Sequence, residues 1–389
     1  AFIMGAAAII PITLCFAAAG SRVSSTGGPY TYVGASFGSF AGFITGALMW
    51  IGNVVSGPGV ANGLNEQVAH VLPSLGEGWP RAMFFVVLYA VLVALNAFGV
   101  RLGARAIVAL ATVKLTPLVI LASVGLFFVD WSQVSLTAIP SWPALGASMI
   151  MVIFAYSGIE TALMPSGEVR DPARDVPRAA IAALLIVVLV YVGIQTVAQG
   201  VLGAELAGHK TPLAATAGRI WGPAFTLLLI TASVSMFGFL MGNVLGSSRA
   251  VYALGRDGYL PAPIGRVTER YRVPLNAVLL HSAIGCLLAI FGTFEFLITM
   301  SGGANCLVYI AVAIAAWKLQ RGDTREHGEP FRLPGGAWAI PAVSVFAMVA
   351  ILTTMSRNEW LAIVASLVAL VVIFAILRAL RRSDATRAS

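Results

Sequence analysis

The chain has 389 residues, of which 59% are hydrophobic and only 10% are charged. A soluble domain carries roughly 25% charged residues, so this composition excludes a water-soluble globular protein. The formal net charge of +8 would suit a nucleic-acid partner, but the basic residues lie in short clusters between long apolar runs. That arrangement is typical of membrane-topology signals, and it predicts an all-α integral membrane protein that contacts the lipid bilayer and no nucleic acid.

The cysteines and histidines argue against a redox or metal centre. Cys15, Cys286 and Cys306 each lie singly within an apolar run, which predicts neither a disulfide nor a metal site. The four histidines are scattered along the chain and cannot supply the paired axial ligands of a multi-haem membrane enzyme. We therefore expect no cofactor, no bound metal and no enzymatic activity.

Apolar stretches of about 17 to 25 residues predict eleven membrane-spanning helices in a single transmembrane domain that covers residues 1–389. The predicted helices cover approximately residues 1–20, 36–62, 82–99, 106–129, 144–165, 179–201, 223–246, 276–292, 296–317, 338–355 and 360–380. The segments between them carry Gly, Pro and charged residues, which are typical of connectors outside the bilayer.

The basic residues also orient the spans. If the first span runs from outside to inside, 19 of the 24 Lys and Arg residues fall in cytoplasmic connectors and 4 fall on the other side. The positive-inside rule favours this orientation. A first span that enters from outside requires a preceding helix to bring the chain there. We therefore expect the chain to be N-terminally truncated and to lack its first transmembrane helix.

Two ionisable side chains, Lys114 and Glu160, are predicted to lie near the middle of the bilayer. Lys114 lies nine residues beyond Arg105, which places it about 13 Å deep in a hydrocarbon core roughly 30 Å thick. A charge inside the membrane costs about 2.5 to 3.5 kcal/mol on insertion scales, which favours a functional role for Lys114. The alternative is a lysine that ties a broken backbone together without titrating.

Glu160 ends the segment 154–160 (FAYSGIE), whose middle is poor in strong helix formers. The helix can unwind there, and free backbone groups at mid-membrane are tolerated only where they line a cavity. Gly158 would let the backbone approach a ligand closely. The alternative is a packing contact at Gly158 with Glu160 hydrogen-bonded to a neighbouring helix, and the spacing does not decide between the two.

Other polar residues also interrupt the apolar spans. Asn53 and Ser56 lie within the span 36–62, and Asn243 lies within the span 223–246. Each could bind a polar ligand or join two helices, and an interhelical hydrogen bond contributes about 0.6 to 2 kcal/mol in membranes. His281, near the cytoplasmic end of its span, is interpreted as a structural residue.

Six short motifs occur in a specific order along the chain. They are GGPY at 27–30, LNAFGVR at 95–101, KLTP at 114–117, FAYSGIE at 154–160, EVRDPARDVPR at 168–178 and SRAVYALGRDGYLP at 248–261. No single motif is decisive. In this order they resemble the amino acid-polyamine-organocation (APC) superfamily of secondary transporters, over nearly the whole chain.

The resemblance implies the leucine-transporter fold, with two inverted repeats of five helices and two further helices, of which eleven of twelve would be present here. In that family, unwound segments of the first and sixth helices hold the substrate amino acid. The resemblance therefore implies that this chain retains the second half of the site, with Phe154 as an aromatic gate. The implied substrate-binding residues of this segment are Phe154, Ala155, Tyr156, Ser157 and Gly158.

The chain is similar to the family's arginine/agmatine antiporter in the third helix and at Glu160, and it departs from that antiporter at Asn243. The resemblance implies substrate contacts from Asn53 and Ser56 on the third helix and from Asn243 on the eighth. Asn243 stands where that antiporter has a tryptophan, which argues against a basic substrate. Glu160 resembles the antiporter's glutamate implicated in proton sensing.

Lys114 is similar to the fifth-helix lysine that, in proton-coupled family members, occupies the position of a coupling sodium ion. Burial favours the neutral form of an amine, so such a lysine can release a proton when the cavity changes its exposure. The resemblance therefore implies proton coupling through Lys114 and Glu160 in place of sodium coupling.

The leading interpretation is an amino acid permease that works by alternating access and is coupled to protons. Arg outnumbers Lys 21 to 3, which indicates a bacterial source and the bacterial cytoplasmic membrane as the location. The alternatives are an antiporter that exchanges an amino acid for its product or a polyamine, and an amino acid sensor that does not transport. An ion channel is disfavoured because the sequence has no ring of like residues and no oligomeric repeat. The sequence leaves the substrate's side chain, the direction of transport and the oligomeric state open.

Overall fold

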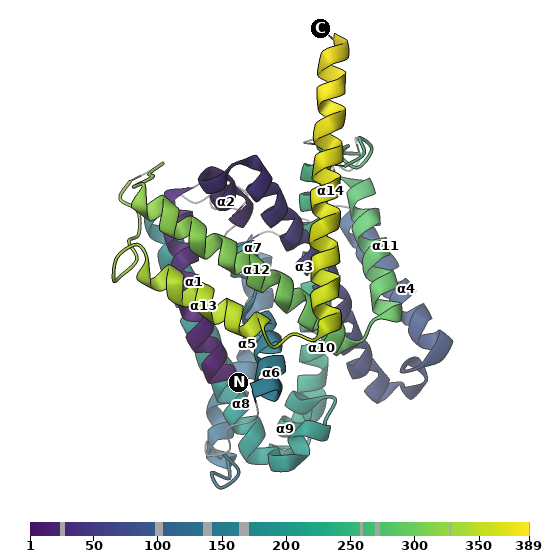
Figure 1. Ribbon diagram of the computed structural model, residues 1–389. Coiled ribbons are helices and arrows are strands. Elements are labelled where there is room, and N and C mark those ends of the chain that lie inside the picture. Colours follow the sequence, from purple (N-terminus) through teal and green to yellow (C-terminus); the bar gives the residue numbers. More distant parts are fainter. Residues whose placement is uncertain are drawn as a thin grey trace.

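The computed structural model describes residues 1–23, 28–97, 104–134, 142–162, 171–256, 260–268, 273–326 and 328–388. Their regular structure is helical, apart from one isolated antiparallel bridge between Thr268 and Val273. The helices form a bundle in which α12 and α13 cross α1, while α4 and α11 lie side by side at one edge (Figure 1).

The helices have the following bounds in chain order. They are α1 (Phe2–Arg22), α2 (Pro29–Phe37), α3 (Ser39–Val71), α4 (Gly78–Ala97), α5 (Ala104–Val124), α6 (Trp142–Tyr156), α7 (Ile159–Ala162), α8 (Pro172–Leu202), α9 (Pro212–Ile220), α10 (Ala224–Arg256), α11 (Leu275–Phe291), α12 (Phe294–Arg321), α13 (Ala339–Leu352) and α14 (Arg357–Ala388), with 3-10 turns η1 (Pro73–Leu75), η2 (Gly125–Phe128) and η4 (Gly203–Gly208).

Within the described residues, six helices are long and apolar enough to cross a membrane, namely α1, α3, α4, α8, α10 and α12. Shorter apolar segments cover Thr112–Phe128, Leu275–Phe291 and Ala339–Leu352. Each of the eleven predicted ranges falls mainly on a helix in the described residues, although the range 36–62 is interrupted at Gly38 and the range 144–165 after Tyr156. The short helix α9 lies outside the predicted spans, and α2 lies before the span 36–62 except for its last two residues.

Two helices continue past their predicted spans. Helix α3 continues beyond the span 36–62, through Asn65, Glu66 and Gln67 to Val71. Helix α10 continues beyond the span 223–246 to Arg256. An apolar run reports the thickness of the hydrocarbon, whereas backbone hydrogen bonds extend a helix into the polar region beyond it.

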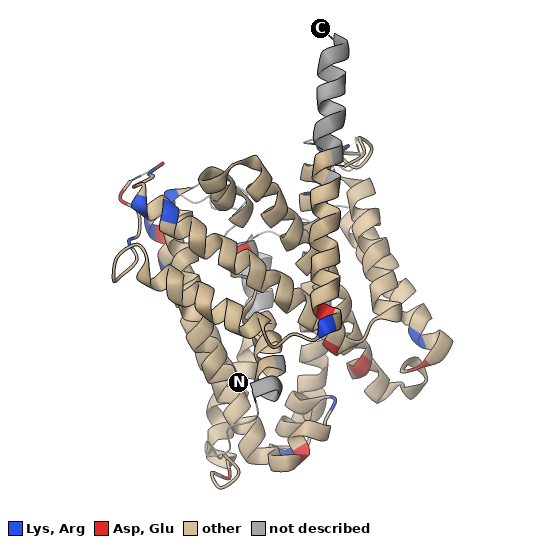
Figure 2. Ribbon diagram, in the orientation of Figure 1, with Lys and Arg blue, Asp and Glu red and all other residues tan. Residues whose placement is uncertain are grey.

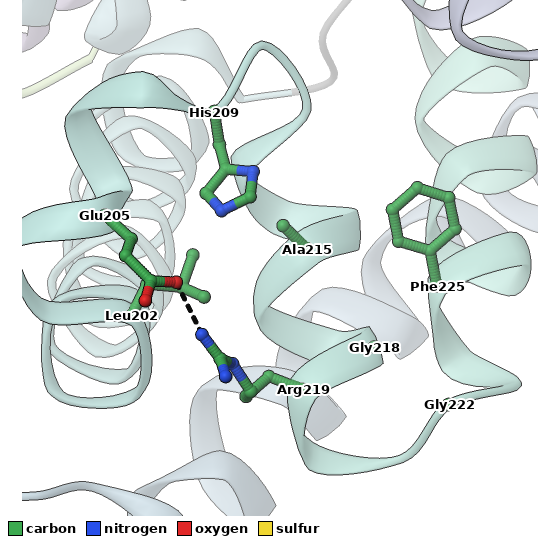
Figure 3. Close-up of a pocket in the computed structure, with 8 residues that line it drawn as sticks. All are labelled: Leu202, Glu205, His209, Ala215, Gly218, Arg219, Gly222 and Phe225. Carbon is green, nitrogen blue, oxygen red and sulfur yellow. Dashed lines mark hydrogen bonds and ion pairs between the residues drawn. The ribbon is translucent and has the colours of Figure 1, made fainter.

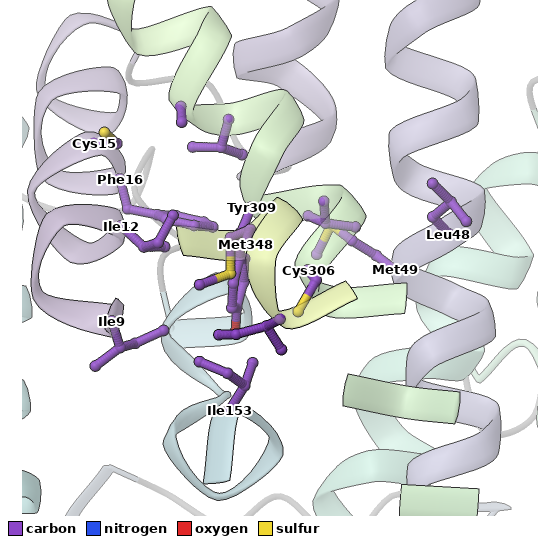
Figure 4. Close-up of a cluster of buried hydrophobic side chains, with 14 of the residues drawn as sticks. Ile9, Ile12, Cys15, Phe16, Leu48, Met49, Ile153, Cys306, Tyr309 and Met348 are labelled. Carbon is purple, nitrogen blue, oxygen red and sulfur yellow. The ribbon is translucent and has the colours of Figure 1, made fainter. Parts of the chain in front are cut away.

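The most interior of the six long helices is α12, with 78% of its apolar window buried against 17% for α10. It packs against α1, α3, α6 and α13, and its Tyr309 stands in the middle of a cluster with Phe16, Ile153 and Met348 (Figure 4). Helices in a membrane associate chiefly through such close packing. Lipid tails are as apolar as the side chains, so the hydrophobic effect does not drive helices together there. The outer helices instead expose apolar side chains such as Leu189 of α8.

Charged side chains gather at helix ends and in loops, while the body of the bundle is mostly uncharged (Figure 2). Arg22 ends α1 and is only 1% exposed. Its guanidinium donates to the carbonyl of Thr324 over 3.2 Å and lies 3.5 Å from the Asp323 carboxylate. Asp323 also pairs with Arg325, and its φ of 47° lies in the left-handed region. The loop after α12 is thereby fastened to the end of α1.

Replacement of Asp323 separates its charge from its backbone conformation. Asparagine and glycine both tolerate the left-handed region, so Asp323→Asn and Asp323→Gly should fold but lose the ion pairs to Arg22 and Arg325. We expect both variants to unfold at a lower temperature than the native protein at pH 7, measured by thermal unfolding in detergent.

The pH dependence of this difference follows from the same ion pairs. The Arg325 guanidinium, helped by Arg22, holds the pKa of the Asp323 carboxyl below its usual value of 3.8. A lowered pKa in the folded state means that the carboxylate stabilises the fold above that value, and that this contribution is lost as the pH falls further. The difference between native and Asp323→Asn should therefore shrink as the pH falls below 3.8 and vanish below the lowered pKa of the folded state. A difference that persisted there would contradict the assignment.

Candidate functional site

The predicted break within the span 144–165 is present. Helix α6 ends at Tyr156 and α7 begins at Ile159, with Ser157 and Gly158 between them. The carbonyl of Phe154 accepts from the Ser157 amide over 3.0 Å and from the Ser157 hydroxyl over 2.6 Å, which closes the last turn of α6. Gly158 has a φ of 122°, a conformation open to glycine and strained for other residues. The segment after Ala162 predicted to complete this range lies outside the described residues.

Glu160 of α7 bonds both to the backbone of the break and to α12. Both of its carboxylate oxygens accept from the Gly158 amide over 3.0 Å, and one also accepts from the Tyr309 hydroxyl of α12 over 3.0 Å. The side chain is 5% exposed. A carboxylate can only accept hydrogen bonds, whereas a carboxylic acid also donates one. Gain or loss of a proton at Glu160 therefore changes which bonds hold α7 to α12.

The residues before the break differ in what they expose. Phe154, Ala155 and Ser157 are partly exposed, whereas Tyr156 is buried. The Tyr156 hydroxyl donates to the Phe2 carbonyl over 3.3 Å, and its ring packs against those of Phe2 and Tyr191. Tyr156 can thus contribute to the site through its backbone, because its side chain is held between α1 and α8. The end of a helix also leaves carbonyl groups without intrahelical partners, and these suit a ligand's ammonium group.

The structure brings Asn53, Ser56 and Asn243 together at the contact of α3 with α10. The Asn243 amide donates to the Asn53 carbonyl over 3.1 Å and to the Ser56 hydroxyl over 3.4 Å. Its oxygen lies 3.2 Å from Nε2 of His281 on α11. The amide of Asn243 is therefore occupied in joining three helices. His281, interpreted from sequence as structural, is a member of this network that no sequence motif placed beside Asn243.

Lys114 lies on α5 and its side chain is exposed, as are those of its neighbours Val113 and Leu115. Helix α5 packs against α8 and α10. Among the described residues Lys114 has no ion-pair or hydrogen-bond partner, so the structure does not bring it into contact with Glu160. The two predicted coupling residues therefore occupy separate environments.

A shallow pocket of about 380 Å³ lies elsewhere, where η4 and α9 meet the start of α10 (Figure 3). It is lined by Leu202, Glu205, His209, Ala215, Gly218, Arg219, Gly222 and Phe225. Glu205 and Arg219 pair with each other across it and are both more than half exposed. None of the predicted site residues lines this pocket, so it is separate from the break.

Comparison with known proteins identifies a family whose sequence pattern this chain matches. The family described as amino acid permease matches residues 1–380. An uncharacterized transporter of Mycobacterium tuberculosis is 31% identical over 329 residues, which cover 81% of this chain and 71% of that protein.

Two characterised relatives cover similar shares. The serine/threonine exchanger SteT of Bacillus subtilis is 27% identical over 85% of this chain and 77% of its own length. The branched-chain amino acid permease BcaP of Lactococcus lactis is 23% identical over 85% of this chain and 74% of its own length.

Substitution of Gly158 tests whether the break is built into the backbone. Gly158→Ala forces a side chain onto a φ of 122° and should lower the free energy of unfolding by about 1 to 3 kcal/mol. Gly238→Ala on α10 is the control, since a Cβ there meets no described atom within 4 Å. A helical alanine at Gly238 should leave stability unchanged or raise it by up to about 1 kcal/mol. Equal effects of the two changes in chemical denaturation would contradict a strained break.

Proposed function

This chain belongs to the amino acid permease family, and from that premise we propose that it works by secondary active transport, through alternating access and with proton coupling. Family membership makes it a multi-pass membrane protein that transports amino acids and is not an enzyme. The family also implies the leucine-transporter type of fold, in agreement with the all-helical bundle.

The observation that carries the proposal is the break between α6 and α7, with its buried carboxylate. Interrupted helices at mid-membrane occur where backbone groups line a substrate cavity. The backbone at Ala155, Ser157 and Gly158 supplies such groups, and Phe154 is placed just before them to cover a bound molecule. The amino acid is bound through the ammonium group that all its kind share, in contact with the carbonyls at the end of α6.

The polar network of α3, α10 and α11 gives the other side of the site its geometry. On α3, the Asn53 carbonyl and the Ser56 hydroxyl are polar groups within an apolar span. The Asn243 amide bonds to both and so holds this stretch of α3 at a fixed distance from α10. Asn243 therefore acts on the substrate through the position of α3 more than through its own amide. Asn53 and Ser56 remain substrate contacts in this proposal.

Proton coupling uses Glu160 and Lys114 at two separate places. When Glu160 takes a proton it loses acceptor capacity toward Gly158 and Tyr309, which frees α7 from α12. Lys114 is exposed on α5, so its proton can exchange with whatever aqueous space reaches that face. Substrate binding at the break changes both environments, which links the flux of amino acid to that of protons.

Exchange is the second candidate function. The relative SteT is named a serine/threonine exchanger, and an exchanger needs the same alternating site without net proton movement. A sensor that binds an amino acid without flux is the remaining alternative. Saturable, competable uptake of an amino acid into liposomes would identify a carrier, whereas binding without flux would identify a sensor.

Variants of Lys114 and Glu160 test the coupling in proteoliposomes. Lys114→Ala and Glu160→Gln should each reduce uptake driven by a pH gradient by at least about tenfold, while counterflow exchange at constant pH is largely retained. Lys210→Ala and Glu205→Gln are matched controls, since both residues are exposed and lie outside the predicted spans. Unchanged pH dependence in Lys114→Ala would reject its coupling role, and the same result for Glu160→Gln would leave that residue a structural part only.

A further inference from the structure

A stripe of polar side chains runs along α12, the most buried of the long helices. Ser301, Asn305 and Tyr309 follow each other at intervals of four residues, so they lie on one face of the helix over about 12 Å. They are 1%, 7% and 0% exposed. The first two residues of the stripe have no part in the function proposed above.

The stripe leads to Glu160. Side chains on an α-helix lean toward its N-terminus, so the Tyr309 hydroxyl is displaced toward Asn305 and the Asn305 amide toward Ser301. At the far end of the stripe, the Tyr309 hydroxyl donates to Glu160 over 3.0 Å. The predicted orientation places the N-terminal end of α12 outside, because Lys318 and Arg321 stand at its other end.

Two members of the stripe have unused hydrogen-bonding groups. The Ser301 hydroxyl is buried without a partner, and the Asn305 amide makes no hydrogen bond to the described part of the chain. A buried polar group without a partner costs about 1 to 3 kcal/mol, which ordered water commonly removes in proteins. A role as interhelical glue would need a polar partner on a facing helix, and neither side chain has one among the described residues.

Helix α3 faces the stripe with a glycine. A Cβ built on Gly52 would stand 3.1 Å from Oδ1 of Asn305 and 3.8 Å from the Ser301 carbonyl oxygen. The absence of a side chain at this position therefore lets α3 approach the Asn305 amide closely without covering it with a methyl group. Buried polar groups without protein partners are the groups that ordered water molecules bind in proteins.

We propose that Ser301 and Asn305 bind water molecules that extend the Tyr309–Glu160 hydrogen bond toward the outer end of α12 and deliver protons to Glu160. The inference rests on the proton coupling proposed above and adds its route. In the transfer step, the Tyr309 hydroxyl proton passes to the Glu160 carboxylate, and the tyrosine oxygen takes a proton from the adjoining water. Tyr309 ends neutral, Glu160 ends as the acid, and the water chain recovers its proton from the outside solution.

Among the described residues, Tyr309 is the side chain that is bonded to Glu160 and can donate a proton to it. The Tyr309 hydroxyl of α12 bonds to it, and the other titratable members of the hydrophobic cluster around Tyr309 are Cys15, Tyr32, Tyr156 and Cys306. Among the described residues no Lys, Arg or His side chain bonds to it. A proton that reaches Glu160 along described side chains therefore passes through Tyr309.

The test replaces Asn305 with leucine, which has a similar size and no hydrogen-bonding groups. In proteoliposomes, Asn305→Leu should lower pH-driven uptake by at least about tenfold while counterflow exchange stays within about twofold of the native rate. Asn305→Ser, which is small and polar enough to admit water, should restore most of the pH-driven uptake. Asn96→Leu is the matched control, because Asn96 is a buried asparagine of α4 whose hydrogen bonding in the described part of the chain goes to Leu92 of the same helix.

The outcomes separate this route from the coupling on which it rests. Equal losses of pH-driven uptake and counterflow in Asn305→Leu would indicate a packing role and overturn the route. A native protein with no proton flux would overturn the proposed coupling and the route together. If Asn305→Leu does not fold, Ser301→Ala decides, with the same selective loss expected and an unchanged ratio of the two rates contradicting the proposal.

Discussion

The structure around the break depends on one constraint: a backbone amide inside hydrocarbon needs a hydrogen-bond acceptor. Gly158 leaves the helical path, so its amide has no carbonyl four residues earlier to bond. The Glu160 carboxylate accepts that amide with both oxygens and also accepts the Tyr309 hydroxyl. One side chain thus satisfies the interrupted backbone and ties it to the central helix. The interrupted helix is stabilised because this carboxylate replaces the acceptor that the helix no longer supplies.

The same arrangement separates the tasks of the site among different helices. Hydrogen bonds of Asn243 to Asn53 and to His281 join α3, α10 and α11 and so fix these three helices relative to one another. The backbone is interrupted between α6 and α7, and α12 carries the Tyr309 hydroxyl that donates a hydrogen bond to Glu160. Lys114 stands apart on α5. Any communication between Lys114 and Glu160 therefore runs through helix movement or through the bound substrate, since no bond between described residues joins them.

The sequence was sufficient for the helices and the break, but not for the partners of the polar groups. Apolar runs predicted where helices lie but not how far they continue, as α3 does to Val71, because backbone hydrogen bonds extend a helix past the hydrocarbon. Ser157 and Gly158 predicted the interruption because both are poor helix formers: the serine hydroxyl competes for backbone hydrogen bonds, and glycine loses more backbone freedom in a helix than other residues do. Tyr309 was missed, since an aromatic residue in an apolar span resembles packing and its partner lies 149 positions away. The missing first helix, the single domain and the coupling residues remain predictions.

The fastening of α1 has a consequence for how the protein is made. Arg22 bonds to a residue 302 positions later, and Ser21 accepts from the Phe331 amide 310 positions later. A ribosome adding about 5 to 20 residues per second needs roughly 15 to 60 seconds to reach those partners. During that interval the newly inserted α1 has its polar end unpaired, with only lipid, water or the insertion machinery beside it. The contacts that fasten α1 to the loop after α12 can therefore form only after more than 300 further residues have been added.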